Sequence, residues 1–189
     1  MGDESTATAE RQKAAAFTAQ NPLTNNSLLT TEQHNIIIVL MIPPFTRTGY
    51  LPSGIHPAIW QEFVDRFGWN DHRRELIGGL WIAVDGLHEA GCRVVYVDGS
   101  FATAIAIPND FDACWDPTDV DIPLLADLLP DLFDFANKRA AQKARFRGEL
   151  FPAFSPANAG GQPFLEFFQF DRDGRPKGIV MLDLRSWEL

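Results

Sequence analysis

The chain has 189 residues, 46% hydrophobic and 22% charged, so it can form one soluble domain with a substantial core. Its 25 acidic and 16 basic residues give a formal charge of −9. This net charge excludes a protein that binds nucleic acid over its whole surface, although it is compatible with a local basic patch. The two cysteines, Cys92 and Cys114, lack metal-binding spacing and are expected to be reduced, packed thiols.

The N-terminal part predicts a flexible extension, residues 1–40, ahead of a domain at 41–189. Residues 1–33 are rich in Ala, Thr, Asn and Gln, so they would bury too little surface to fold alone. The longest apolar run, residues 36–42, is far too short to cross a bilayer and lacks signal-peptide features. We therefore expect a cytoplasmic protein without membrane contacts.

From residue 56 onward the sequence predicts alternating helices and strands, because helical apolar spacing and short β-branched runs follow one another. The expected helices span 56–68, 72–90 and, divided at Pro130, 118–146. The expected strands span 92–97, 110–115, 148–154, 164–170 and 175–184. The last two are expected to form a β-hairpin around an Asp-Gly turn. This order indicates a single α/β (α+β) domain in which helices flank a mixed sheet.

One stretch, "VDGSFATAIAIPNDFDACW" at 97–115, carries a pattern that points to chemistry. Gly99-Ser100 ends a buried strand, and nine residues later Asp110 and Asp112 would share one face of the next strand. Two such carboxylates repel each other unless they stay exposed or share a cation. Mg²⁺ accepts carboxylate and phosphate oxygens together, and a Gly-Ser turn can approach a phosphate closely. A plain turn followed by an exposed strand is the alternative interpretation.

A basic segment follows, with five cations in ten positions and no acidic residue from 135 to 148. These cations are Lys138, Arg139, Lys143, Arg145 and Arg147. We expect Lys138, Arg139 and Lys143 to bind the triphosphate, because its leaving group needs positive charge beside a metal. The alternative is a solvated helix face.

The Gly-Ser and Asp-x-Asp pattern resembles the signature of the polymerase-beta-like nucleotidyltransferase superfamily, which includes minimal nucleotidyltransferases of bacteria and of toxin–antitoxin systems. The resemblance implies a nucleotidyltransferase-like mixed sheet. It also implies that Gly99 and Ser100 hold the triphosphate of an NTP, while Asp110 and Asp112 bind two Mg²⁺ ions.

The superfamily takes a third carboxylate from a neighbouring strand, as a metal ligand or as the base for the acceptor hydroxyl. Glu149, which comes 37 residues after Asp112, is the first candidate, and Glu166 and Asp183 are alternatives. The superfamily more commonly has aspartate as its third carboxylate, and the glutamate side chain is longer by one methylene group. An ordinary residue at the start of an exposed strand would also explain Glu149.

From Met41 onward the chain also resembles a family of uncharacterised bacterial and phage proteins, through stretches such as "MIPPF", "NDFDACWDP" and "FFQFDRDGRPKGIV". Because this resemblance begins at "MIPPF", Met41 is a candidate for the native start. The first resemblance implies transfer of a nucleoside monophosphate from an NTP to a protein, RNA or small-molecule acceptor, in a toxin–antitoxin or defence context. The alternatives are an inactive relative that binds nucleotide or a partner protein, and an interaction protein with an incidental acidic pair. The acceptor and the oligomeric state stay open.

Overall fold

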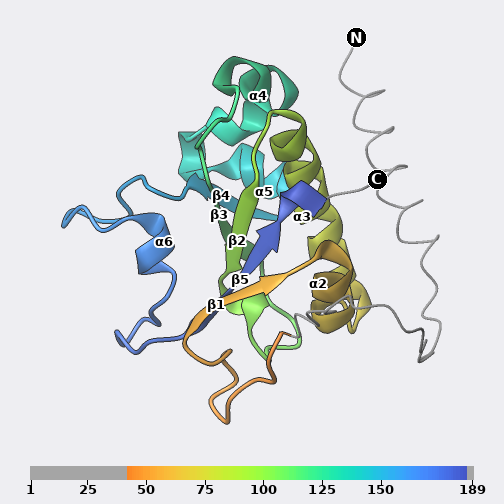
Figure 1. Ribbon diagram of the computed structural model, residues 1–189, viewed down its shortest axis with the longest axis vertical. Helices are drawn as coiled ribbons and strands as arrows, with labels where there is room; N and C mark the ends of the chain where they lie inside the picture. Colours follow the sequence, from red (N-terminus) through yellow and green to blue (C-terminus); the bar gives the residue numbers. More distant parts are fainter. Residues whose placement is uncertain (1–41, 187–189) are drawn as a thin grey trace, which may run out of the picture. The chain divides into compact units, whose positions relative to one another are not determined.

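The computed structural model describes residues 42–186, which form a five-stranded mixed sheet flanked by helices (Figure 1). This confirms the expected fold class. The expected extension at 1–40 and the start at Met41 lie outside the described residues. The strands are β1 (Gly54–Ala58), β2 (Val94–Asp98), β3 (Phe111–Trp115), β4 (Gly148–Pro152) and β5 (Gly178–Asp183).

The strand order across the sheet is β1-β5-β2-β3-β4. β1 runs parallel to β5 and β3 parallel to β4, whereas β2 is antiparallel to both of its neighbours. As a result, the end of β2 and the starts of β3, β4 and β5 meet at one end of the sheet, the lower end in Figure 1. The turn that follows β2 lies at this end.

Five α-helices and four short 3₁₀ segments complete the described part of the chain. The α-helices are α2 (Trp60–Phe67), α3 (Asp71–Glu89), α4 (Ile122–Leu128), α5 (Ala140–Phe146) and α6 (Phe164–Phe167). The 3₁₀ segments are η1 (Ser100–Ala102), η2 (Pro130–Phe133), η3 (Ala136–Lys138) and η4 (Leu184–Ser186). The predicted helix at 72–90 corresponds to α3, and it begins where the side chain of Asn70 accepts a hydrogen bond from the backbone N–H of Arg73.

The two faces of the sheet carry separate cores. The larger core includes Val95 and Val97 of β2 together with buried residues of α2, α3 and α5, and α2 and α3 lie on one side of the sheet in Figure 1. The smaller core gathers Cys114, Phe151, Phe168 and others, with residues of α6 packed against it. Because strand side chains alternate, a residue two positions from a member of the smaller core lies on the α6 face.

Both cysteines are buried and free, as the sequence predicts. Burial raises the pKa of Cys92 to about 11, and burial also raises the pKa of Cys114. Neither thiol is therefore a ready nucleophile.

The predicted helix over 56–68 is wrong in its first part. Residues Gly54–Ala58 form the edge strand β1, and helix α2 begins only at Trp60. A proline is tolerated on an edge strand as well as in the first turn of a helix, so Pro57 fits both structures. The predicted end at Gly68 is confirmed, since this residue follows the last residue of α2.

The predicted β-hairpin over 164–184 is confirmed only at its tip, where Phe170 and Pro176 form an antiparallel bridge, and is wrong in its arms. Its second arm forms β5, but β5 lies between β1 and β2. Its first arm contains the single-turn helix α6, which begins at Phe164 and is followed by Phe168. Both of these rings pack against Phe151. The expected turn at Asp171 is present, and its carboxylate accepts hydrogen bonds from two later backbone N–H groups.

The basic segment is broken rather than one continuous helix. Asn137, Lys138 and Arg139 all have positive φ, and α5 begins only at Ala140. The predicted division at Pro130 is confirmed, because α4 ends before it and η2 begins there.

A buried glutamine ties α5 to the edge strand β4. The Gln142 side chain donates to the Leu132 carbonyl at 2.8 Å and accepts from the Leu150 N–H at 3.0 Å.

Among residues 42–186, no helix combines the length and apolar character that a membrane crossing requires.

Candidate functional site

Three carboxylates lie side by side across β2, β3 and β4. Asp98 pairs with Asp112, and Asp112 pairs with Glu149, so each strand contributes one residue at the same level of the sheet. Cys114 belongs to the smaller core two residues after Asp112, which places the row on the α6 face. Asp110, just before β3, adds negative charge near Asp112. The structure thus brings Asp110, Asp112 and Glu149 together, as the sequence predicts.

The glycine turn lies directly against this row. Gly99 has φ 77° and ψ −168°, a backbone conformation open to glycine alone. A Cβ atom at Gly99 would lie 2.5 Å from the Asp112 Oδ2 atom and 3.0 Å from its backbone nitrogen. Ser100 then begins η1. The two halves of the motif, separated by nine residues in sequence, are therefore in contact.

Asp112 is the electrostatic centre of the row. Burial, followed by the charges of Asp98, Asp110 and Glu149, raises the pKa of Asp112 to about 7. The positive charge of Lys177 lowers the pKa of Asp112 and so opposes this shift in part. A carboxylate in this state gains free energy by binding either a proton or a cation.

Two of the expected cations reach the third carboxylate. The Lys143 Nζ atom lies 3.0 Å from one Glu149 oxygen, and an Arg139 guanidinium nitrogen lies 3.7 Å from the other. The hydrogen bond to Glu149 raises the pKa of Lys143, and the charges of Asp110 and Asp112 add to the shift. The positive groups thus stand beside the carboxylate row, where a triphosphate would need them.

The remaining cations of the basic segment point elsewhere or stay in solvent. Arg145 pairs with Asp131 at 3.1 Å and donates to the Leu128 carbonyl, on the side of α4 and η2. Lys138 and Arg147 are exposed. Only part of this segment therefore faces the candidate site.

The sequence interpretation missed a buried ion pair at the same end of the sheet. Lys177, the residue before β5, pairs with Asp98, and both side chains are about nine-tenths buried. Burial raises the pKa of Asp98, while Lys177 lowers it. The only local feature of the sequence that points to Asp98 is its position directly before Gly99, because its ion-pair partner Lys177 lies 79 residues away.

The loop between Gly99 and Asp110 is held by an arginine that the sequence interpretation also missed. Arg73, fully buried on α3, donates to the carbonyls of Phe67 and Ile105, both at 2.6 Å, and to that of Phe101. Its guanidinium lies 3.8 Å from the ring centroid of Trp69 and 4.4 Å from that of Phe101. Burial lowers the pKa of Arg73 to about 10, so it remains charged at neutral pH.

Two neighbours of Arg73 hold the same loop. The Asn70 side chain donates to the Ala106 carbonyl at 2.9 Å, and a His72 ring nitrogen lies 2.5 Å from the Pro108 carbonyl oxygen. The start of α3 therefore fixes the backbone that carries the chain from the glycine turn to Asp110.

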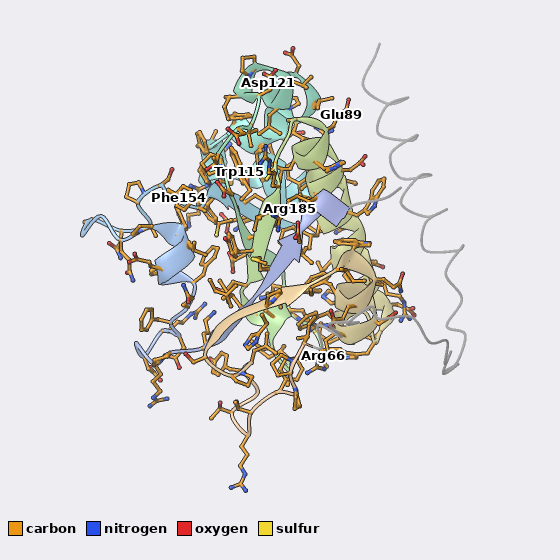
Figure 2. The ribbon with its side chains drawn as sticks, viewed as in Figure 1. Arg66, Glu89, Trp115, Asp121, Phe154 and Arg185 are labelled. Atoms are coloured by element: carbon orange, nitrogen blue, oxygen red, sulfur yellow. The ribbon has the colours of Figure 1, made fainter. Side chains whose placement is uncertain are left out.

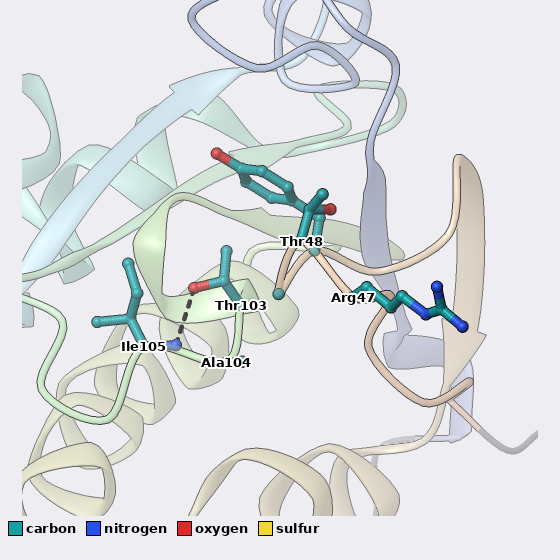
Figure 3. Close-up of a pocket in the computed structure, with 7 residues that line it drawn as sticks. Arg47, Thr48, Thr103, Ala104 and Ile105 are labelled. Atoms are coloured by element: carbon teal, nitrogen blue, oxygen red, sulfur yellow. Dashed lines mark hydrogen bonds between the residues drawn. The ribbon is translucent and has the colours of Figure 1, made fainter.

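A hollow of about 340 Å³ adjoins this loop (Figure 3). It is lined by Arg47, Thr48, Gly49, Tyr50, Thr103, Ala104 and Ile105. The Thr103 hydroxyl donates to the Ser100 carbonyl at 2.6 Å and accepts from the Ile105 N–H at 3.2 Å. Thr103 therefore connects the wall of the hollow to the glycine turn.

Neither alternative third carboxylate is among the residues that the strand pairing of β2, β3 and β4 brings into the row. Asp183 pairs with Val94 at the opposite end of β2 and forms an ion pair with Arg185 at 2.6 Å. Glu166 is exposed on α6. Within the described residues, no three His, Cys, Asp or Glu side chains are arranged to hold a metal ion as they stand. In this arrangement Glu149 instead contacts two cations.

The comparisons with curated proteins and with solved structures give no match to this chain. A protein-family model matches residues 43–183, a range that contains the glycine turn, the carboxylate row and the basic segment. The chain belongs to that family, a family of unknown function designated DUF6932.

Proposed function

We propose that the protein is a Mg²⁺-dependent nucleotidyltransferase, which moves a nucleoside monophosphate from a nucleoside triphosphate to an acceptor hydroxyl. The observation that carries the proposal is the contact between Gly99 and Asp112, which joins a backbone turn suited to phosphate with a row of carboxylates. The resemblance to polymerase-beta-like enzymes assigns these same two elements to triphosphate and metal. The cytoplasmic setting and the toxin–antitoxin or defence context remain predictions from the sequence.

The donor groups fit Mg²⁺. Asp110, Asp112 and Glu149 offer the hard carboxylate oxygens that this ion prefers. The raised pKa of Asp112 supports the fit, since a cation would relieve the repulsion that raises it. We assign Asp110 and Asp112 as the principal ligands and Glu149 as the third. When bound, the metal would neutralise phosphate charge and polarise the α-phosphate.

The residues of the chain then take distinct roles. Gly99 and Ser100 hold phosphate oxygens through backbone N–H groups and the hydroxyl. Lys143 and Arg139 turn from Glu149 to the β- and γ-phosphates. The acceptor oxygen bonds to the α-phosphorus, the bond from that phosphorus to the β-phosphate oxygen breaks, and pyrophosphate leaves with the electron pair. The released Glu149 carboxylate takes the acceptor proton.

A second candidate function is nucleotide or partner binding without catalysis. The ion pairs of Glu149 with Lys143 and Arg139 favour it, because they compete with metal binding by this carboxylate. In that case the Gly99 turn and the carboxylate row would still bind a nucleotide.

Isothermal titration of ATP, GTP, CTP and UTP, with and without Mg²⁺, tests the site. We expect the wild-type protein to bind at least one NTP with micromolar to millimolar affinity, and only in the presence of Mg²⁺. The variant Asp110→Asn/Asp112→Asn should lose this binding, because it removes two negative charges from the metal site.

The chain contains a matched control in Asp171 and Asp173, which have the same spacing but lie in an exposed turn. Asp171→Asn/Asp173→Asn should bind NTP as the wild type does. A folded wild-type protein that binds no NTP would overturn the proposal. NTP binding that survives in Glu149→Gln, without transfer to any acceptor by the wild type, would favour the second candidate.

A further inference from the structure

A continuous series of aromatic contacts begins at the candidate site and extends over the α6 face. The Arg139 guanidinium, which is paired with Glu149, lies 4.4 Å from the ring centroid of Phe151 and 5.6 Å from that of Phe135. Phe151 stacks on Phe164 with centroids 4.0 Å apart. Aromatic side chains are therefore contiguous with the groups assigned to the triphosphate.

Several phenylalanines of this region are exposed. Phe135 is 62% exposed, Phe154 is 56% exposed, and Phe167 on α6 is 45% exposed. Phe154, labelled in Figure 2, begins the loop that leads from β4 to α6. Phe167 joins the series through Phe168, with centroids 6.3 Å apart. Large apolar rings in water are unfavourable, and a group of them is typical of a binding surface.

Exposed cations lie next to these rings. Lys138 and Lys143 are exposed and belong to the segment that has no acidic residue from 135 to 148. In a chain with a formal charge of −9, this segment is a local reversal of sign. It would attract a polyanion to the neighbourhood of Glu149.

We infer that this surface binds the 3′ end of single-stranded nucleic acid as the acceptor. Bases of any sequence can stack on exposed rings while cations follow the phosphates, which is the usual basis of single-strand binding. The core of a protein-binding patch is instead depleted in charge, whereas here Phe135 lies within three residues of Lys138 and next to Arg139.

This inference rests on the proposed transfer reaction and names its acceptor. The 3′-hydroxyl oxygen would form the new bond to the α-phosphorus, pyrophosphate would leave, and Glu149 would take the hydroxyl proton. The product is the same strand, longer by one nucleotide. The exposed rings bind the preceding nucleotides and so bring the 3′ end to the carboxylate row.

Fluorescence anisotropy with fluorescein-labelled 12-mers tests the inference. The probes are oligouridylate, the matching deoxy strand and a 12-base-pair duplex, all at 50 mM and 200 mM salt. We expect both single strands to bind more tightly than the duplex, with affinity that falls as salt rises. In Phe135→Ala/Phe154→Ala the affinity should fall about tenfold or more, because two bases lose the rings on which they stack.

The control is Ile59→Ala, which removes an exposed apolar side chain between β1 and α2, at the edge of the sheet opposite β4. It should bind the strands as the wild type does, and both variants should keep the wild-type circular dichroism spectrum. Equal affinity for duplex and single strand, or wild-type affinity in the phenylalanine variant, overturns the inference. Tighter binding of the uridylate than of the deoxy strand identifies RNA as the acceptor.

Titration of NTP and Mg²⁺ on the same samples separates this inference from the proposed function. NTP binding without strand binding overturns the acceptor assignment alone. Strand binding without NTP binding overturns the transfer reaction and, with it, the acceptor role.

Discussion

The loop at 99–110 and the segment at 153–177 both connect strands of the candidate-site region of the sheet, but different interactions hold them. Side chains at the start of α3 donate hydrogen bonds to backbone carbonyls of the first, and Arg73 alone contacts two of its residues. The second is anchored by stacked phenylalanines and leaves other rings in solvent. Polar anchoring fixes the backbone beside Asp112, whereas aromatic anchoring leaves a surface available for a ligand.

The largest expected effect comes from removing the arginine that anchors the first loop. Arg73→Met leaves two buried carbonyl acceptors and one part-buried acceptor without their donor, so we expect it to lower the free energy of unfolding by about 3–6 kcal/mol. Urea denaturation followed by tryptophan fluorescence measures this loss.

Arg93→Met is the control, since Arg93 is largely exposed and forms one surface ion pair with Asp119. It should change the free energy of unfolding by less than about 1 kcal/mol. Equal stability of the two variants would show that the loop does not depend on its arginine anchor.

An intermediate effect is expected from the charge of Asp112 and depends on pH. The unfolded chain releases this proton near pH 4, whereas the folded protein keeps it up to about pH 7. The contribution to stability is therefore complete below pH 4, falls as pH rises, and is lost above pH 7. Asp112→Asn should remove this dependence, so relative to wild type it gains about 2–3 kcal/mol between pH 5 and pH 8.

Urea denaturation at pH 5 and pH 8 without metal gives both values. Asp171→Asn, in an exposed turn, should show no such gain. A stability difference between Asp112→Asn and wild type that is independent of pH would contradict the assignment of Asp112 as the electrostatic centre.

The smallest effect compares one glycine from each region. Gly99 and Gly174 have nearly the same φ, 77° and 74°. An added Cβ would meet Asp112 at Gly99 but finds nothing within 4 Å at Gly174. We expect Gly174→Ala to cost about 1 kcal/mol from backbone strain, and Gly99→Ala about 2 kcal/mol because the contact adds to the strain.

Thermal unfolding of the two glycine variants, together with NTP titration, checks this difference. Gly99→Ala should also lose NTP binding, and Gly174→Ala should keep it. Equal losses of stability and binding would mean that the close approach of Gly99 to Asp112 has no special role.

The part of the site that could be predicted is the part that lies close in sequence. Gly99, Asp110 and Asp112 are visible because a strand, a turn and the alternation of side chains relate them within fourteen residues. Glu149 was predicted from the superfamily resemblance together with its position at the start of an expected strand. The pairing of β3 with β4 then places it beside Asp112.

The rest depends on contacts that leave no local pattern. The partner of Asp98 is 79 residues away, and Arg73 bonds to carbonyls, which every residue possesses. The aromatic run at 164–168 suits a strand as well as a helical turn, and only its stacking on Phe151 distinguishes them. The alternation of helices and strands was predictable because it follows from periodicity along the chain.

The link between Gln142 and the Leu150 N–H has a consequence for assembly. β4 lies at one edge of the sheet, where an outward N–H would otherwise be available to a strand of another molecule. At the other edge, β1 contains Pro57, which has no N–H to offer. Both borders of the sheet thus discourage edge-to-edge aggregation.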